Sequence, residues 1–183
     1  MNLTNHFLVS MPQMQDSCFR DTVVYVLDHG DQGAFGVIIN DALGIDFDSL
    51  LTQVGIISTT ETTRAVMVLR GGPVDENHGL VLHKPGLQFD TTHDFNHGVS
   101  LSSSRDILEA IARDEAPSPF LIVLGHSGWA PGQLEIEIAE NAWLTCLADT
   151  DILFNTPLQD RRQAVASLIG INMSHVVGHS GNA

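Results

Sequence analysis

The apolar run FLIVL at 120–124 leads directly into GHSG at 125–128, a pattern that resembles the nucleophile turn of a serine hydrolase. That turn joins a strand to a helix and needs glycine two residues before and two residues after the serine, so that neighbouring backbones can pass closely. Gly125 meets this need for Ser127, but Trp129 occupies the second glycine position. We also interpret the residues that follow as a strand. The sequence therefore predicts a tight turn between strands and no catalytic serine.

Two histidines have the spacing of metal ligands if their segment is helical. His93 and His97 are four residues apart and are flanked by Asp90 and Asp94. The surrounding segment, 84–98, contains Gly, Pro, Asp and Thr with little periodicity, which predicts a long surface loop. It contains no HExxH motif and no cysteine pair. We expect no metal and no cofactor.

A pair of glutamates lies in the run LEIEIA at 134–139, whose alternation of apolar and polar residues predicts a half-exposed strand. On a strand, Glu135 and Glu137 share one face and lie roughly 7 Å apart. Two catalytic carboxylates could use this separation. Alternating glutamates are also typical of the solvent-facing side of an antiparallel strand, and we favour that interpretation.

Two glycine-rich segments leave apolar strands, one at 70–73 and one at 125–133. Neither contains GxGxxG or a P-loop lysine, so we expect no nucleotide site. Ligands in sheet proteins tend to bind where loops leave strand ends. We therefore expect Gly71, Gly72, Gly128 and Gly132 to be structurally required and to line one shared pocket. Its predicted residues are Arg70, Gly71, Gly72, Pro73, His83, Gly128, Trp129, Gly132 and Gln133.

The remaining chain supplies the elements that must position these residues. Runs 22–27 and 34–39 predict a hairpin, and 65–69 and 79–83 predict a second strand pair. Helices are expected after Asp46 or Asp48, after Ser102 or Ser103, and over residues 158–169. We predict an α+β protein with one domain over 1–183, in which 172–183 form a partly disordered tail.

Composition limits the partners. The 183 residues include 22 acidic and 8 basic side chains, a net charge of −14, so phosphate backbones are repelled and we expect no direct nucleic-acid binding. No apolar run is long enough to span a membrane, and residues 1–15 lack the features of a secretory signal. Cys18 and Cys146 are expected to be reduced thiols in a cytoplasm, although one disulfide remains open.

Four segments resemble the YqgE/AlgH family of bacterial proteins: the run NHFLVSMPQMQDSCFRDTVVYVLDHGDQGAFGVIIN, then RGGPVDENHGLVLH, LGHSGWAPGQLEIEIAENAWL and the closing LIGIN. The resemblance covers nearly the whole chain. It implies a compact domain with a bent, mixed, partly barrel-like sheet flanked by helices. It implies no reaction, although one branch carries a transcriptional-regulator label. Departures include Asp41-Ala42 where lysine-proline is usual, and His78 where arginine is common.

These observations leave two functional interpretations. The favoured one is a non-catalytic ligand-binding or regulatory module that acts through a small molecule or a protein partner of unknown identity. The alternative is a hydrolase or metal-dependent enzyme with an unrecognised site around His83, His126, Ser127, Glu135 and Glu137.

Overall fold

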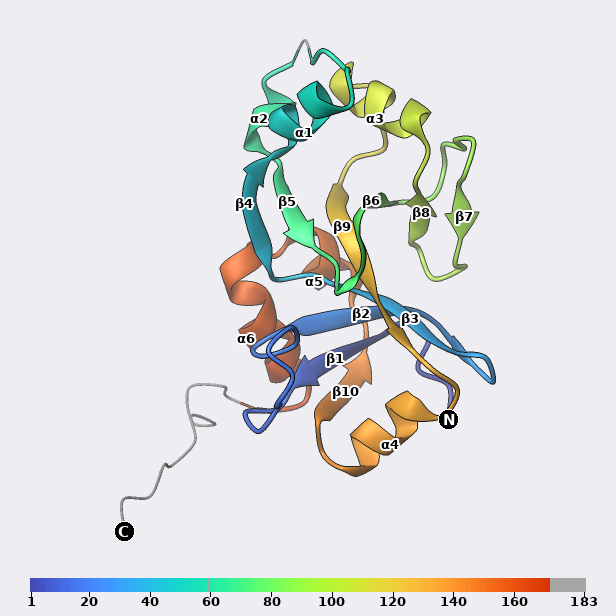
Figure 1. Ribbon diagram of the computed structural model, residues 1–183, viewed down its shortest axis with the longest axis vertical. Coiled ribbons are helices and arrows are strands. Elements are labelled where there is room, and N and C mark those ends of the chain that lie inside the picture. The colour runs from blue at the N-terminus through green and yellow to red at the C-terminus, as the bar shows by residue number, and fades with distance from the viewer. Residues whose placement is uncertain (59, 172–183) are drawn as a thin grey trace. The chain divides into compact units, whose positions relative to one another are not determined.

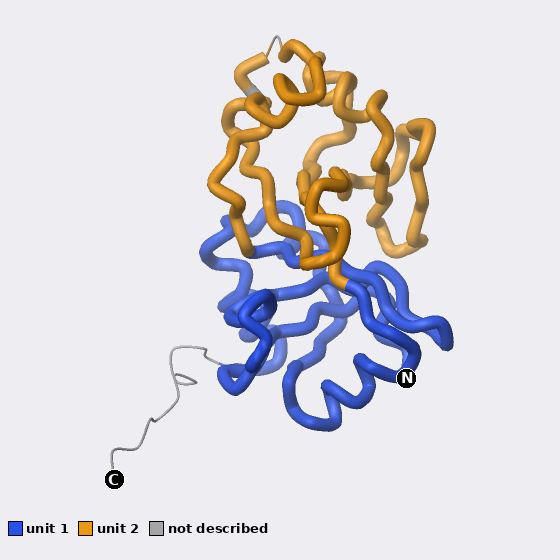
Figure 2. The backbone as a smooth tube through the Cα atoms, in the orientation of Figure 1, with its two compact units in different colours: residues 1–40, 128–183 blue, residues 41–127 orange. Residues whose placement is uncertain are grey.

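A computed structural model describes residues 1–58 and 60–171 (Figure 1). The predicted tail, 172–183, lies outside the described residues. The chain forms two compact units, one made of Met1–Asn40 and Gly128–Ala183 and the other of Asp41–Ser127 (Figure 2). Each unit is described in turn.

Unit 1 contains an antiparallel sheet in the order β10-β1-β2-β3. Its strands are β1 (His6–Ser10), β2 (Val23–Gly30), β3 (Gly33–Ile38) and β10 (Trp143–Leu147), and its helical segments are α4 (Gln133–Ala139), α5 (Thr150–Asn155), the 3-10 turn η1 (Leu158–Asp160) and α6 (Arg161–Leu168). The β2–β3 hairpin predicted from its β-branched runs and its glycine-rich turn is confirmed. Beside it, Leu8, Trp129 and Trp143 pack in one buried cluster with residues of β2.

Unit 2 contains a mixed sheet in the order β4-β5-β9-β6-β8-β7, in which β5 and β9 are parallel and the other pairs are antiparallel. Its elements are β4 (Ala42–Asp46), α1 (Phe47–Gln53), α2 (Thr62–Ala65), β5 (Met67–Arg70), β6 (Val74–His83), β7 (His93–Asp94), β8 (Ser100–Ser102), α3 (Arg105–Ala112) and β9 (Phe120–Trp129), whose last two residues belong to unit 1. The predicted pairing of 65–69 with 79–83 is wrong, because β9 lies between β5 and β6.

The helices of unit 2 begin close to where their capping residues predict. Asp46 caps α1 by accepting a hydrogen bond from the backbone N–H of Ser49, and Gly55 follows the helix with φ of +72°. The N-cap of α3 is Ser104, one residue beyond the predicted position. Both helices place apolar residues four positions apart in the core of the unit, Phe47 with Leu51 and Ile107 with Ile111.

The prediction for 134–139 is wrong, because these residues form helix α4. Alternation over six residues does not distinguish the period of a strand from that of a helix, because Leu134 and Ile138 are also four residues apart. Gln, Leu, Glu and Ala all favour the helix. In α4, Leu134 is buried, Ile138 is partly buried against the same cluster, and Ile136 is 61% exposed. The last helix also differs from its prediction, since residues 158–160 form the 3-10 turn η1.

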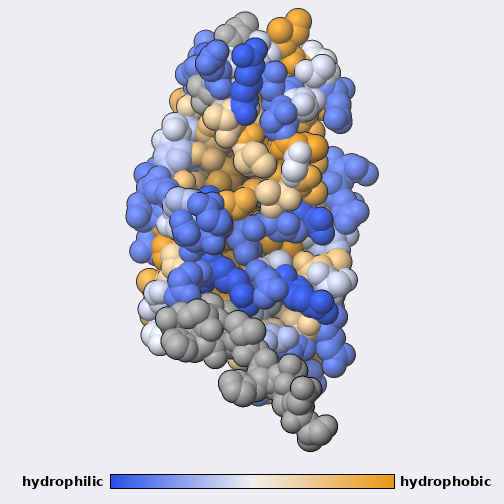
Figure 3. All heavy atoms as spheres, turned by 90° about the vertical axis from the view of Figure 1, so that its left-hand side faces the viewer, coloured by the Kyte–Doolittle hydropathy of each residue, from blue (hydrophilic) through white to orange (hydrophobic). Residues whose placement is uncertain are grey.

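Apolar side chains also reach the surface. Figure 3 shows them gathered between hydrophilic ones over unit 2. The exposed large apolar residues of this unit are Val54, Ile57, Met67, Val74 and Leu87.

Among the described residues, no helix is long and apolar enough to cross a membrane.

Candidate functional site

The two tryptophans of the chain come together in unit 1. Trp129 ends β9, Trp143 begins β10, and their ring centroids are 6.1 Å apart. Phe19, from the segment between β1 and β2, stacks on Trp129 at 6.0 Å and meets Trp143 edge-on at 5.5 Å. Both indoles are more than nine-tenths buried. The three rings form a rigid aromatic wall.

Glu137 of α4 holds this wall in place. One carboxylate oxygen, Oε2, accepts hydrogen bonds from the indole Nε1–H of Trp129 at 2.9 Å and of Trp143 at 2.8 Å. The other oxygen, Oε1, accepts a hydrogen bond from the side-chain amide of Gln133 at 2.8 Å. Hydrogen bonds to a charged acceptor are roughly twice as strong as neutral ones. The carboxylate therefore fixes both indole rings from one point.

A cavity of about 440 Å³ lies against these residues. Met14, Phe19 and the two tryptophans give it an apolar side, and Asp16, Glu137 and Glu140 give it an acidic one. We call it the aromatic pocket. Its lining includes Gly128, Trp129 and Gln133, three of the residues predicted from the sequence.

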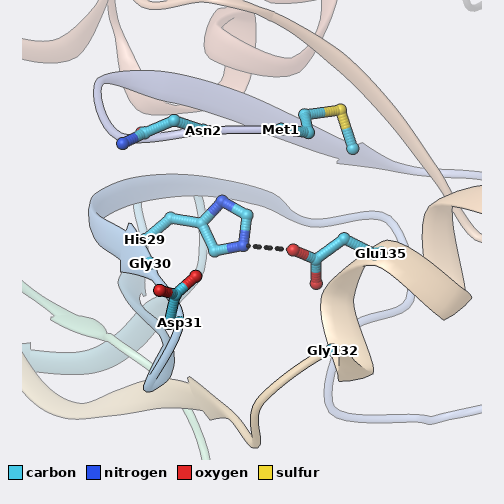
Figure 4. Close-up of a pocket in the computed structure, with 7 residues that line it drawn as sticks. All are labelled: Met1, Asn2, His29, Gly30, Asp31, Gly132 and Glu135. Carbon is cyan, nitrogen blue, oxygen red and sulfur yellow. Dashed lines mark hydrogen bonds and ion pairs between the residues drawn. The ribbon is translucent and has the colours of Figure 1, made fainter.

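A second cavity in unit 1, of about 630 Å³, is lined by His29, Glu135 and Gly132, and also by Met1, Asn2, Gly30 and Asp31 (Figure 4). His29 is buried, and its Nδ1 accepts a hydrogen bond from the backbone N–H of Leu3 at 2.9 Å. The proton therefore resides on Nε2, which donates to Glu135 Oε1 at 3.0 Å. With both ring nitrogens engaged, His29 joins three chain segments and offers no free base.

Glu135 and Glu137 thus face different partners. Two residues along a helix turn the side-chain direction by about 200°. This explains why Glu135 reaches His29 in the second cavity while Glu137 reaches the indoles. The predicted common face of the two glutamates is wrong, because it assumed a strand.

The pKa of Glu135 is lowered, first by a hydrogen bond from its own backbone N–H and further by its contact with His29. A carboxyl with a lowered folded pKa stabilises the protein above its unfolded pKa, and this stabilisation is lost as the pH falls through the folded value. We expect Glu135→Gln to be less stable than the wild type at pH 6, with a difference that shrinks towards pH 3. Urea titrations at several pH values measure it. In the control Glu61→Gln, whose parent side chain is 96% exposed, the difference from wild type should change little. If the stability difference between Glu135→Gln and the wild type did not change with pH, the expectation would be contradicted.

Of the other predicted pocket residues, Gly132 lines the second cavity of unit 1. Arg70, Gly71, Gly72, Pro73 and His83 belong to unit 2, where the 70–73 turn forms a tight backbone crossing. Gly71 N–H donates to the carbonyl of Leu124 at 2.7 Å, and the hydroxyl of Ser127 donates to the carbonyl of Gly71 at 3.1 Å. Arg70 pairs with Asp41 at 3.4 Å. Gly72 is buried with φ of +150°, and Pro73 is exposed. We predict from the sequence that the 70–73 turn and His83 share a cavity with Gly128, Trp129, Gly132 and Gln133, and this stays a prediction.

His83 belongs to an enclosed polar network in unit 2. Its Nδ1–H donates to the carbonyl of Lys84 at 2.9 Å, so its Nε2 accepts the hydroxyl proton of Ser102 at 2.9 Å. Ser102 also bonds Thr92 at 2.8 Å. This serine–histidine pair has the bonding of a nucleophile and its base, but both residues have no exposed surface, so a substrate cannot reach them. The pair ties β6 to β8.

The loop histidines predicted to have no metal role lie in 84–98. His93 is in β7 and packs against the ring of Phe95 at 4.5 Å, and Asp94 accepts hydrogen bonds from Ser100 and Gln88. Within 1–58 and 60–171, no group of three or more His, Cys, Asp or Glu side chains is arranged to hold a metal ion. Cys18 and Cys146 are not joined by a disulfide.

The predicted tight turn at 125–128 is wrong, because these residues continue β9. Ser127 lies inside this strand, is fully buried, and donates its hydroxyl proton to a backbone carbonyl. We expect Ser127→Ala to keep the fold and to lose about 1–2 kcal/mol of unfolding free energy, the cost of one unsatisfied acceptor. We also expect no labelling of the wild type by a fluorophosphonate probe. Circular dichroism and intact mass spectrometry provide the two measurements, and stoichiometric labelling at Ser127 would refute the second.

Comparisons with known proteins identify the family of the chain. A family profile described as AlgH-like matches residues 7–174. A UPF0301 protein from Laribacter hongkongensis (strain HLHK9) is 44% identical over 99% of this chain and 97% of its own length. A UPF0301 protein from Vibrio atlanticus (strain LGP32) is 41% identical over the full length of both. The chain therefore belongs to the AlgH-like family, as its sequence motifs predict.

Solved structures show the same fold. The solution structure of the AlgH protein from Pseudomonas aeruginosa is 39% identical, has a TM-score of 0.83, and is matched over 100% of this chain and 97% of that one. An X-ray structure from Corynebacterium diphtheriae shares the fold at 17% identity, with a TM-score of 0.70 over 96% and 92% of the two chains. The predicted α+β class with a mixed sheet is confirmed.

Proposed function

We propose that the protein is a non-catalytic binding or regulatory module, and that it acts by binding a small molecule, or a group of a protein partner, in the aromatic pocket. One observation carries the proposal: the Glu137 carboxylate fixes two indoles beside a cavity of about 440 Å³. Binding sites are concave and combine apolar walls with polar groups held in fixed positions, and this pocket combines the aromatic wall with the fixed carboxylate of Glu137.

The pairing of the polar groups supports binding over catalysis. A general base or nucleophile needs a reactive atom that can reach substrate. In His29 and His83 both ring nitrogens are engaged, and the hydroxyl of Ser127 is buried and donated to Gly71. The alternative of a hydrolase or metal-dependent enzyme has less support for this reason.

Charge favours partners other than nucleic acid. The chain has a net charge of −14, which repels phosphate backbones. We therefore include in the proposal that the protein does not contact DNA directly, and we also propose a cytoplasmic location. A regulatory role would then operate through a ligand or another protein.

The pocket supplies its own reporter, because the two tryptophans of the chain both line it. A library of soluble metabolites is screened by intrinsic tryptophan fluorescence, and compounds that change the emission are retested by thermal shift. A ligand that binds only the folded state raises stability by about 2.7 kcal/mol at 100 times its dissociation constant. We expect saturable binding that Phe19→Ala weakens and Phe95→Ala, in unit 2, leaves unchanged. A library with no saturable binder, or binding equally sensitive to both changes, would refute the proposal.

A further inference from the structure

The charged side chains that line the aromatic pocket all carry the same sign. They are Asp16, Glu137 and Glu140, and no lysine or arginine is among the described residues that line it. The imbalance extends through unit 1, which has ten acidic residues and three arginines. Two of these arginines are engaged elsewhere: Arg161 donates to the carbonyls of Ile39 and Thr156, and Arg162 pairs with Asp21 at 3.0 Å. A cation entering the pocket would meet only negative charges among the side chains that line it.

Glu137 offers charge but little hydrogen-bonding capacity. A carboxylate has about four acceptor positions, and three of them are occupied by the two indole N–H groups and the Gln133 amide. A primary ammonium needs three acceptors to replace its hydration, so burial against this carboxylate costs it hydrogen bonds. An ammonium group in which alkyl groups replace all the hydrogens has no N–H donors, so it needs no hydrogen-bond acceptors.

The apolar side of the pocket fits such alkyl groups. Met14 and Phe19 are partly buried and pack against the tryptophan cluster. Aromatic rings attract cations through their electron-rich faces, and quaternary ammonium groups are bound in this way by aromatic side chains together with carboxylates. We infer that the ligand of the aromatic pocket carries an alkylated ammonium group. The inference rests on the proposed function and specifies its ligand class.

The test compares a cation with a neutral molecule of the same shape. Tryptophan emission is titrated with choline, with 3,3-dimethylbutan-1-ol, in which carbon replaces the charged nitrogen, and with ethanolamine, at ionic strength held constant with KCl. We expect saturable binding of choline, about tenfold tighter than that of either comparison compound. Equal affinity for choline and the neutral alcohol overturns the inference and leaves the proposed function standing. No response to choline also overturns it, while the metabolite screen decides the proposed function separately.

Variants of the acidic pocket residues test whether choline binds in the aromatic pocket. Glu137→Gln retains a side-chain oxygen for the indoles but removes the charge, and Glu140→Gln removes a charge from the exposed rim of the pocket. We expect each to weaken choline binding, Glu137→Gln by about tenfold. Glu61→Gln, an exposed site in unit 2, should bind as the wild type does. If Glu137→Gln does not fold, Glu140→Gln carries the test. Unchanged choline affinity in the folded pocket variants would overturn the inference.

Discussion

Replacing Gly71 with alanine is expected to lower the free energy of unfolding by about 3 kcal/mol or more. A Cβ atom on Gly71 would lie 2.1 Å from the carbonyl oxygen of Gly125 and 3.1 Å from its carbonyl carbon. The obstructing atoms belong to the backbone of Gly125, and the next nearest is the Cβ of Val123 at 3.3 Å, so no flexible end of a side chain can move aside. The crossing would have to separate, with loss of the Gly71–Leu124 and Ser127–Gly71 hydrogen bonds. Urea denaturation followed by circular dichroism measures the loss.

Gly128, from the other glycine-rich segment, is the matched control, because it is exposed and a Cβ atom added to it would meet nothing within 4 Å. Gly128→Ala should change stability by less than about 0.5 kcal/mol. Neither space nor backbone conformation requires glycine at Gly128, contrary to the expectation that Gly71, Gly72, Gly128 and Gly132 are all structurally required. Equal losses in Gly71→Ala and Gly128→Ala would show that close backbone approach is not the cause.

Glu137→Ala is expected to cost about 2–4 kcal/mol of unfolding free energy, because it leaves two buried indole N–H groups without their acceptor. Tryptophan emission should shift to longer wavelength as water replaces the carboxylate. Chemical denaturation and emission spectra of the same samples provide both measurements.

Glu140→Ala is the control for Glu137→Ala, since Glu140 follows α4 directly and its side chain is exposed. It removes the same charge and should leave the emission maximum in place. A stable Glu137→Ala with unchanged emission would mean that the carboxylate does not position the indoles.

The sequence predicts the fold well where the spacing of apolar residues fits only one type of secondary structure. The β-branched runs of β2 and β3 have a glycine-containing turn between them, and they form the expected hairpin. The pattern at 134–139 fits both periods, and the helix forms because its residues favour helix and because Leu134 and Ile138 pack against one buried cluster. The position of β9 between β5 and β6 depends on pairing at long range, which no local pattern encodes.

The site was predictable in part. Trp129, Gln133 and Gly128 attract attention because they follow an apolar strand, and the structure places them in one pocket. Phe19 was missed because it contacts the two tryptophans from more than 100 residues away in the sequence, and Trp143 was missed although it contacts Trp129 from the neighbouring segment. Tryptophan is rare enough in this chain that the spacing of its two copies could have drawn attention to both. The role of Glu137 depends on a helix that the sequence pattern did not predict.

The pairing of β1 with β10 affects how the chain can be synthesised. His6 lies opposite Leu147 and Ser10 opposite Trp143, and the whole of unit 2 is encoded between them. At about 5–20 residues per second, translation needs on the order of ten seconds to deliver β10 after β1 has left the ribosome. Until then β1, whose Phe7, Leu8 and Val9 are fully buried in the finished protein, has an edge with no partner strand. The nascent chain is therefore most exposed to chaperones and to aggregation while its middle portion is being made.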